Sequence, residues 1–291
     1  MLTLPAAGGD SAPLRSLIVP APAKINLFLH VTGRRADGYH DLESLFVALG
    51  FSDTVTLARR DDGAVARSTD LAGVPAAADL AVRAALALQR ETGSAYGVDI
   101  GVDKRIPQGA GLGGGSSDAA SVLLALNRLW NLDLPRAALL RIGRSLGADV
   151  PFFVFGRPAI ARGIGERLTA VSLPPAWVAV LCPGVAVATA GIFAAPELTR
   201  DTPSAKMDVF SEGYGRNDLQ AVAVARFPDI AVARAALGHR ARMTGSGSSV
   251  FAVFATEAQA SAALAEAKQA APGARGFVAR TLARHPLAAF A

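Results

Sequence analysis

The chain has 291 residues, of which 51% are hydrophobic, so it can bury a sizeable core, and its length indicates one large or two modest domains. Its formal net charge is +5 at pH 7, but the arginines are scattered singly and no basic stripe alternates with aromatic residues. We therefore expect anionic small molecules, and not nucleic acid, as partners. The single cysteine, Cys182, excludes an internal disulfide and a cysteine-based metal cluster, and it fits a reducing, cytoplasmic compartment.

The N-terminal segment over residues 1–16 is predicted to be a flexible tail, because it lacks the apolar region of a signal peptide. No uninterrupted apolar run reaches the roughly 18 residues of a membrane span, so we expect no membrane insertion. An edge strand is predicted over residues 17–22. Residues 23–31 then alternate, with Lys24 and Asn26 on the same face, and such a face is either solvated or part of a site.

The next polar signal is the pair Tyr39 and His40, which follows a turn-rich connector. A tyrosine and a histidine at this place either cap an edge of the core or stack on and hydrogen-bond a flat heterocycle. The pattern further predicts strands over residues 45–49 and 54–57, a helix over residues 76–92 that Gly93 ends, and a strand over residues 98–104.

The glycine-rich loop of residues 107–117 is the strongest signal in the chain, since five of the seven residues from Gly109 to Gly115 are glycine. Glycines let a bulky group approach bare backbone amides. A helix is predicted directly after the loop, with Ser117 or Asp118 as its cap. Unpaired amides and the positive end of a helix dipole suit a di- or triphosphate. The lysine of a Walker loop is absent, and the glycines are too dense for a Rossmann loop.

Asp149 lies between the end of a predicted helix at Gly147 and the apolar run of residues 150–155. A carboxylate in such surroundings is costly to bury unless a cation pairs with it. The alternative is that Asp149 caps a short turn begun by Pro151. A strand pair is predicted next, over residues 159–168.

A composition shift at residues 173–175 predicts a boundary between two domains, residues 17–171 and residues 172–291. Strands and helices alternate in the second domain, which indicates an α+β fold. We expect strands over residues 177–182, 241–243, 250–254 and 276–280, helices over residues 219–226, 230–237 and 256–269, a loop over residues 183–200, and a polar segment that ends at residue 218. The small-residue turn of residues 244–249 either closes a hairpin or contacts a phosphate or substrate.

Three stretches, residues 22–27, 109–120 and 244–249, together resemble the three motifs of the GHMP kinase superfamily. The match is closer to one family within it: residues 23–29 with 33–40, 111–117 and 146–152 resemble the signature of 4-diphosphocytidyl-2-C-methyl-D-erythritol kinases. These enzymes phosphorylate the 2-hydroxyl of a CDP-linked methylerythritol in the non-mevalonate route to isoprenoids. Ser248 and Ser249 depart from the pattern, because relatives often carry Ala and Cys there.

The resemblance implies a two-domain fold. An ATP-binding N-terminal domain of the ribosomal-protein-S5 domain 2 type would pack against a ferredoxin-like C-terminal domain, with the active site in the cleft between them. The implied cofactors are ATP and Mg²⁺, the metal being carried mostly by the nucleotide phosphates with the hydroxyl of Ser116 or Ser117 as a candidate ligand. The protein's own metal ligands and its state, monomer or homodimer, stay open.

The resemblance also implies roles for individual residues. Asp149 would be the catalytic base and Lys24 its charge partner. The ATP-binding residues would be Pro107, Gln108, Gly109, Ala110, Gly111, Leu112, Gly113, Gly114, Gly115, Ser116 and Ser117. The substrate-binding residues would be Asn26, Tyr39, His40, Thr189, Phe193, Gly245, Ser246 and Gly247, with the cytosine held by Tyr39, His40 and Phe193.

Three other functions remain open at this stage. A kinase of the same superfamily that acts on homoserine, mevalonate or a sugar would have no base for Tyr39 and His40 to hold. A non-catalytic nucleotide sensor would not need Asp149, which is present. A nucleic-acid-binding module would be retained on heparin at moderate salt.

Overall fold

The computed structural model describes residues 14–204 and 215–291. Residues 1–13 of the predicted tail and residues 205–214 of the predicted polar segment lie outside the described residues. The strands are β1 (Ser16–Arg34), β2 (His40–Arg60), β3 (Val65–Arg67), β4 (Gly97–Asp103), β5 (Ala159–Gly163), β6 (Arg167–Ala170), β7 (Trp177–Cys182), β8 (Arg242–Met243), β9 (Val250–Phe254) and β10 (Arg275–Leu282). The helices are α1 (Leu80–Thr92), α2 (Gly114–Leu129), α3 (Arg136–Leu146), α4 (Val150–Phe155), α5 (Thr189–Phe193), α6 (Leu219–Arg226), α7 (Pro228–Ala236) and α8 (Glu257–Ala270). The predicted α+β class is confirmed.

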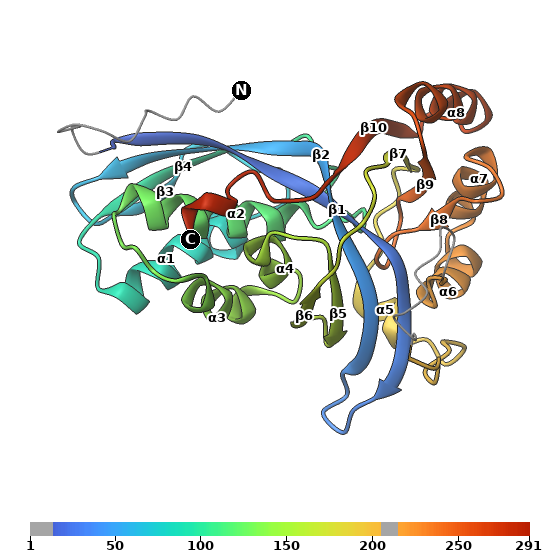
Figure 1. The fold of residues 1–291 in the computed structure, drawn as a ribbon, viewed down its shortest axis with the longest axis horizontal. Helices are drawn as coiled ribbons and strands as arrows, with labels where there is room; N and C mark the ends of the chain where they lie inside the picture. Colours follow the sequence, from blue (N-terminus) through green and yellow to red (C-terminus); the bar gives the residue numbers. More distant parts are fainter. Residues whose placement is uncertain (1–13, 205–214) are drawn as a thin grey trace.

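β1 and β2 form one long antiparallel hairpin, which extends along both halves of the molecule (Figure 1). The sequence predicts two shorter strands in place of β2, interrupted around residues 50–53. β2 instead continues through this stretch because β1 pairs with it there, with Ala21 opposite Asp53. Register shifts between Pro22 and Lys24, and again after Asn26, interrupt the predicted alternation of β1. Both faces of β1 are buried around Lys24 and Asn26, so neither of these two side chains is solvated.

The first half of the chain packs helices α1 to α4 against one face of the sheet formed by β1, β2 and β4 (Figure 1). α2 lies innermost, with twelve buried residues, and contacts β1, β2 and its neighbouring helices. α1 starts later than predicted, because Asp79 caps it by accepting a hydrogen bond from the Ala81 N–H. Gly93 ends it in the left-handed conformation, as predicted.

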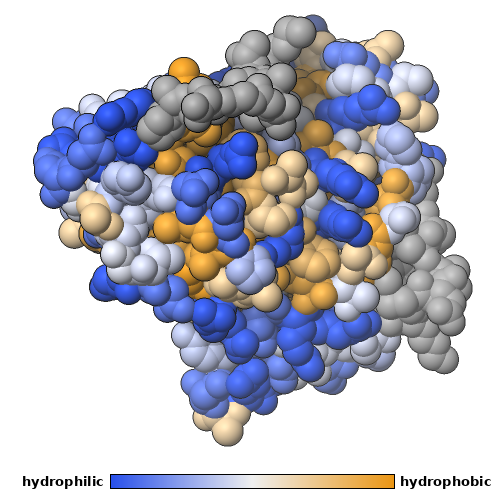
Figure 2. Space-filling model, turned by 60° about the vertical axis from the view of Figure 1, so that its left-hand side comes forward, coloured by the Kyte–Doolittle hydropathy of each residue, from blue (hydrophilic) through white to orange (hydrophobic). Residues whose placement is uncertain are grey.

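The second half of the chain forms a smaller layered unit of β7, β9 and β8 with α6, α7 and α8 (Figure 1). The predicted loop of residues 183–200 contains the short helix α5. Among the described residues, no helix is both long enough and apolar enough to cross a membrane. Seen from the side in Figure 2, hydrophilic side chains surround several apolar patches and are not gathered into one stripe.

β10 joins the two halves, because it pairs with β7 through residues 275–280 and with β2 through residues 281–282. The last residues then pack against the first half, where Asn127 donates a hydrogen bond to the Phe290 carbonyl at 2.9 Å. Arg136 likewise donates to the Ala288 carbonyl at 2.6 Å. The predicted domain boundary between residues 171 and 172 stays a prediction. Residues 281–291, which follow this boundary in the sequence, return to the first half of the chain.

Candidate active site

A cavity of about 830 Å³ is lined by the β1–β2 hairpin, the glycine-rich loop, the residues before α4, helix α5 and the turn between β8 and β9. Fourteen of the predicted site residues line it: Lys24, Asn26, Tyr39, His40, Gly109, Gly111, Gly113, Ser116, Asp149, Thr189, Phe193, Gly245, Ser246 and Gly247. The remaining predicted residues belong to the same loop and helix start but do not line the cavity: Pro107, Gln108, Ala110, Leu112, Gly114, Gly115 and Ser117.

Lys24 and Asp149 meet in this cavity, although they come from β1 and from the start of α4. The Nζ of Lys24 lies 3.4 Å from Oδ2 of Asp149. The lysine side chain is 4% exposed and the aspartate side chain 32% exposed, so the carboxylate faces the cavity and the ammonium supports it from the protein side. Asp149 is the residue that precedes α4, but its side chain makes no capping hydrogen bond. The alternative that Asp149 caps a short turn begun by Pro151 is therefore wrong.

A chain of buried hydrogen bonds holds the lysine in place. Lys24 Nζ donates to Oδ1 of Asn26 at 2.7 Å, and Nδ2 of Asn26 donates to the Ser44 hydroxyl at 2.7 Å. That hydroxyl donates in turn to the Phe28 carbonyl at 2.6 Å. Because each member is buried and satisfied, the position of Lys24 is fixed by β1 and β2.

The glycine-rich loop ends where α2 begins. Gly113 precedes the helix at a positive φ of 71°, and no side chain caps the helix start. The prediction that Ser117 or Asp118 caps it is wrong, because the helix takes Gly114 into its first turn and buries both residues inside it. The helix start is therefore left with uncapped backbone N–H groups, which is the arrangement that binds anions. A Cβ at Gly113 would lie 3.0 Å from Cγ of Lys24, so this helix start packs directly against the lysine.

The glycine-rich loop also packs closely, backbone against backbone, on the turn between β8 and β9. A Cβ at Gly111 would lie 2.3 Å from the Thr244 carbonyl oxygen, closer than any side chain allows. The Thr244 hydroxyl accepts a hydrogen bond from the Asn26 N–H at 2.9 Å. The turn thus closes a β8–β9 hairpin, as predicted, and also lines the cavity, while its contact with a phosphate or substrate stays a prediction.

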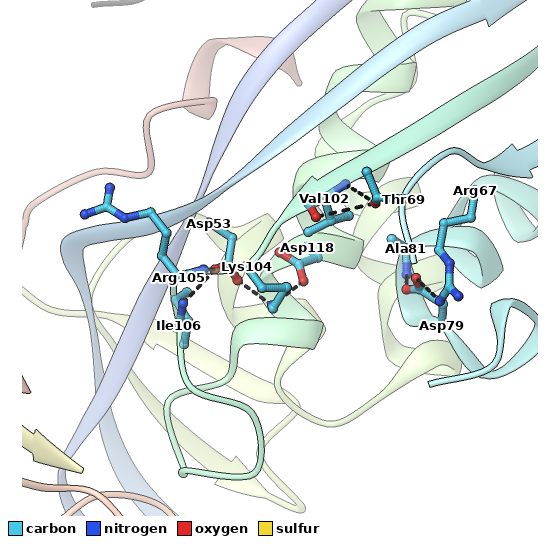
Figure 3. A network of polar contacts seen from close by, with 10 residues as sticks. All are labelled: Asp53, Arg67, Thr69, Asp79, Ala81, Val102, Lys104, Arg105, Ile106 and Asp118. Carbon is cyan, nitrogen blue, oxygen red and sulfur yellow. Dashed lines mark hydrogen bonds and ion pairs between the residues drawn. The ribbon is translucent and has the colours of Figure 1, made fainter. Parts of the chain in front are cut away.

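A buried ionic cluster, which we call the Asp53 cluster and which consists of Asp53, Lys104 and Asp118, holds the two ends of the glycine-rich loop (Figure 3). Lys104 follows β4 and its Nζ contacts Asp53 on β2 and, at 2.6 Å, Oδ2 of Asp118 on α2. Asp53 also accepts hydrogen bonds from the backbone N–H groups of Arg105 and Ile106 at 2.6 and 2.7 Å. The cluster therefore ties β2, the entry to the loop and the first turns of α2 together.

The Asp53 cluster carries two carboxylates and one ammonium. Burial, opposed by the charge of Lys104 and aided by that of Asp53, raises the pKa of Asp118 from 3.8 to about 7. The free energy of unfolding of Asp118→Asn, measured relative to that of the wild type, is expected to increase by about 2–3 kcal/mol between pH 5 and pH 8. A carboxyl with a raised folded pKa is protonated at pH 5 and ionised at pH 8, so the wild type loses stability as the pH rises. Asparagine does not ionise.

Thermal unfolding of both proteins at pH 5 and pH 8 would measure this difference. The melting temperature of Asp118→Asn relative to the wild type should rise by about 2–6 °C over the interval. A variant that loses more stability at pH 8 than at pH 5 would show that Lys104 needs an ionised Asp118.

The aromatic end of the cavity, which we define as Tyr39, His40 and Phe193, lies near the tip of the β1–β2 hairpin and beside α5. The rings of His40 and Phe193 are stacked, with centroids 5.2 Å apart and planes 28° from parallel. Tyr39 is 62% exposed. Burial, together with the positive charges of Arg200 and Arg34, lowers the pKa of His40 below its ordinary value of 6.5. These causes favour the neutral form of the His40 ring.

Sequence reasoning missed several residues that support the site. Arg200 donates from Nε to Nε2 of His40 at 3.1 Å, and Asn217 donates to the Gly245 carbonyl at 2.7 Å. Ser44 completes the hydrogen bonds around Asn26. No local pattern could have found them, because each acts on a partner that is distant in sequence. Thr189 and Ser246, which were predicted, share a hydrogen bond between their hydroxyls at 2.7 Å.

Comparisons with known proteins agree with this geometry. The model of the GHMP kinases N terminal domain matches residues 79–157, and that of the GHMP kinases C terminal domain matches residues 196–273. A 4-diphosphocytidyl-2-C-methyl-D-erythritol kinase of Ralstonia pickettii is 55% identical over 290 residues, which cover 97% of this chain and 99% of that protein. The enzyme of the same name from Thiobacillus denitrificans is 56% identical over 271 residues, covering 92% and 96%.

Solved structures give the same result. A crystal structure of 4-(cytidine 5'-diphospho)-2C-methyl-D-erythritol kinase superposes with a TM-score of 0.78 at 36% identity and covers 91% of this chain and 99% of its own. A mevalonate kinase structure superposes with a TM-score of 0.64 at 13% identity, which shows a shared fold alone. The two-domain GHMP kinase fold expected from the sequence is confirmed. The chain belongs to the GHMP kinases and, within them, to the family of 4-diphosphocytidyl-2-C-methyl-D-erythritol kinases.

Proposed function

We propose that this protein transfers the γ-phosphoryl group of ATP to the 2-hydroxyl of 4-diphosphocytidyl-2-C-methyl-D-erythritol, releasing ADP, in the non-mevalonate route to isoprenoids. One observation carries the proposal. A buried lysine and a half-buried aspartate, 3.4 Å apart, share a single cavity with an uncapped helix start and with stacked aromatic rings. This combination offers a place for a phosphate chain, a base for an alcohol and a surface for a flat heterocycle.

In the proposed mechanism, Asp149 is the catalytic base. Its carboxylate, which faces the cavity, accepts the proton of the substrate 2-hydroxyl as the oxygen attacks the γ-phosphorus. The ammonium of Lys24 stabilises the ionised carboxylate and, since it lies against Gly113 at the helix start, also the negative charge of the transferring phosphoryl group. Asn26 accepts a hydrogen bond from Lys24 and so orients the ammonium toward both the carboxylate and the transferring phosphoryl group.

The phosphate chain of ATP is proposed to lie over the glycine-rich loop. Phosphoryl transfer needs accurate positioning and neutralisation of charge more than covalent chemistry. The backbone amides at the start of α2 would position the phosphates, and together with the helix dipole they would neutralise charge without any side chain. Mg²⁺ commonly takes substrate phosphates and few protein ligands, and the hydroxyl of Ser116, which lines the cavity, fits such a donor set. Bound Mg²⁺ would offset the charge of the phosphates.

The aromatic end of the cavity is proposed to bind the cytosine, with the methylerythritol reaching back toward Asp149. Thr189 and Ser246, which also line the cavity and share a hydrogen bond, would offer their hydroxyls to the polyol or the diphosphate. We also propose that the protein works in the cytoplasm, as a monomer or a homodimer, with these two small molecules as its partners.

A coupled ADP-release assay tests the proposal. The protein would be offered 4-diphosphocytidyl-2-C-methyl-D-erythritol, mevalonate, homoserine and galactose side by side at equal concentration. We expect a kcat/KM at least about 10²-fold higher for the first substrate, because the other three carry no base for the aromatic end. Faster turnover of any other substrate would assign the chain to a different kinase activity. ATP binding without turnover of all four would indicate a nucleotide sensor.

A further inference from the structure

Arg200 lies directly behind the aromatic end of the cavity without lining it. Its Nε donates a hydrogen bond to Nε2 of His40 at 3.1 Å. The rest of the guanidinium binds backbone carbonyls, from Nη2 to Phe193 at 3.1 Å and Ala195 at 2.6 Å, and from Nη1 to Leu198 at 2.9 Å and Pro196 at 3.4 Å. All five N–H groups of the guanidinium therefore have an acceptor.

This arrangement fixes the proton on the imidazole. A guanidinium stays protonated in proteins, so it can donate a hydrogen bond but cannot accept one. The ring nitrogen Nε2 of His40 must then be the unprotonated acceptor, and the proton of the neutral ring sits on Nδ1. Among the described residues, Arg200 is the one group hydrogen-bonded to this ring. Nδ1 is left to donate to a ligand in the cavity that His40 lines.

The same guanidinium also holds the second ring of the stack. Its hydrogen bonds to the Phe193 and Ala195 carbonyls fix the end of α5, which carries the Phe193 ring into the cavity. His40, by contrast, comes from the start of β2. Arg200 thus sets the relative position of two rings that come from different elements, although it does not line the cavity itself.

We propose that Arg200 is a positioning residue that sets the tautomer of His40 and thereby makes the aromatic end select cytosine over uracil. The inference rests on the proposed function, since it concerns the base of the same substrate. An N–H donor fixed at Nδ1 matches the unprotonated N3 of cytosine. Uracil carries a proton on N3, so two donors would face each other. Without Arg200, His40 can adopt either tautomer and either base finds a partner.

The first test reads the tautomer directly. The nitrogen chemical shifts and two-bond couplings of ¹⁵N-histidine-labelled protein distinguish a proton on Nδ1 from one on Nε2, and a His40→Gln variant assigns the signal. We expect the wild type to carry the proton on Nδ1, and Arg200→Gln to show a mixture or a proton on Nε2. A wild-type proton on Nε2 would overturn the proposal. This measurement needs no substrate, so its outcome is independent of the proposed function.

The second test compares substrates. For Arg200→Gln we expect KM for the cytidine substrate to rise about 10-fold with KM for ATP unchanged. The ratio of kcat/KM for the cytidine substrate to that for its uridine counterpart should fall about 10-fold. Arg226→Gln is the matched control, because Arg226 also binds the α5 region, through the Gly191 carbonyl at 2.9 Å, but not His40.

The outcomes separate the possible roles of Arg200. An unchanged cytidine-to-uridine ratio, with both values lowered equally, would show a merely structural role and overturn the proposal. Arg200→Met, which has a similar length but no hydrogen-bond donor, provides a second variant should the glutamine fail to fold. It should show the same loss of discrimination. A wild type that turns over neither substrate would contradict the proposed function, and the tautomer measurement would still stand.

Discussion

Asp149→Asn is expected to lower kcat at least about 10²-fold while the affinity for ATP stays nearly unchanged. The amide keeps the shape of the carboxylate but cannot accept the proton of the attacking hydroxyl. The nucleotide phosphates are assigned to the glycine-rich loop and the start of α2. The Asp53 cluster and the hydrogen bond from the Lys24 N–H to the Leu112 carbonyl hold these segments, and neither interaction involves Asp149. Steady-state kinetics give kcat, and calorimetric titration with a non-hydrolysable ATP analogue gives the affinity.

The matched control is Asp133→Asn. Asp133 is an exposed aspartate at a positive φ of 49°, a conformation that asparagine adopts readily, and it does not line the cavity. Its kcat should equal that of the wild type. A kcat of Asp149→Asn within tenfold of the wild type would remove Asp149 from the role of base, because general base catalysis supplies more than that.

Lys24→Met is expected to lower kcat about 10²- to 10³-fold and to raise KM for ATP by a much smaller factor. Methionine fills a volume similar to that of the buried lysine, so the packing against Phe46 and Gly113 is largely kept while the charge is lost. Asp149 is partly exposed and can be hydrated once its partner is gone, so the fold should survive.

The melting temperature and the calorimetric affinity for the ATP analogue check that the lysine variant is folded and binds nucleotide. The informative quantity is the split between kcat and KM. If Lys24→Met changed only KM for ATP, the ammonium would serve to bind the ground state, and its assignment to the transferring group would be wrong.

The sequence was most informative where one short segment carries the whole signal. The density of glycines before a helical pattern predicted the anion-binding loop, and the structure has an uncapped helix start there. The apolar run after Asp149 marked this carboxylate as unusual, but only the fold brings Lys24 to within 3.4 Å of it. The alternation of β1 left open whether the face of Lys24 and Asn26 is solvated or part of a site, and the structure buries both residues because β1 packs into a hydrophobic cluster on each face.

Other features could not be predicted because they depend on tertiary contacts. The continuity of β2 through residues 50–53 results from its pairing with β1, and no local propensity encodes it. Arg200 looks like any other scattered arginine in the sequence, since its partner His40 lies on a different element. The start of α2 was misplaced for a related reason. Serine and aspartate usually cap helices, but here glycine begins the helix and Asp118 pairs with Lys104.

The position of β10 limits how such a protein can be re-engineered. This strand belongs to the end of the chain, yet it is shared between β7 of one half and β2 of the other. A chimera made by exchanging everything beyond residue 171 with a relative would also replace a strand in the middle of the sheet and the terminal residues bound by Asn127 and Arg136. Changes of substrate preference are therefore better grafted locally, at the hairpin tip and α5, than by swapping whole modules.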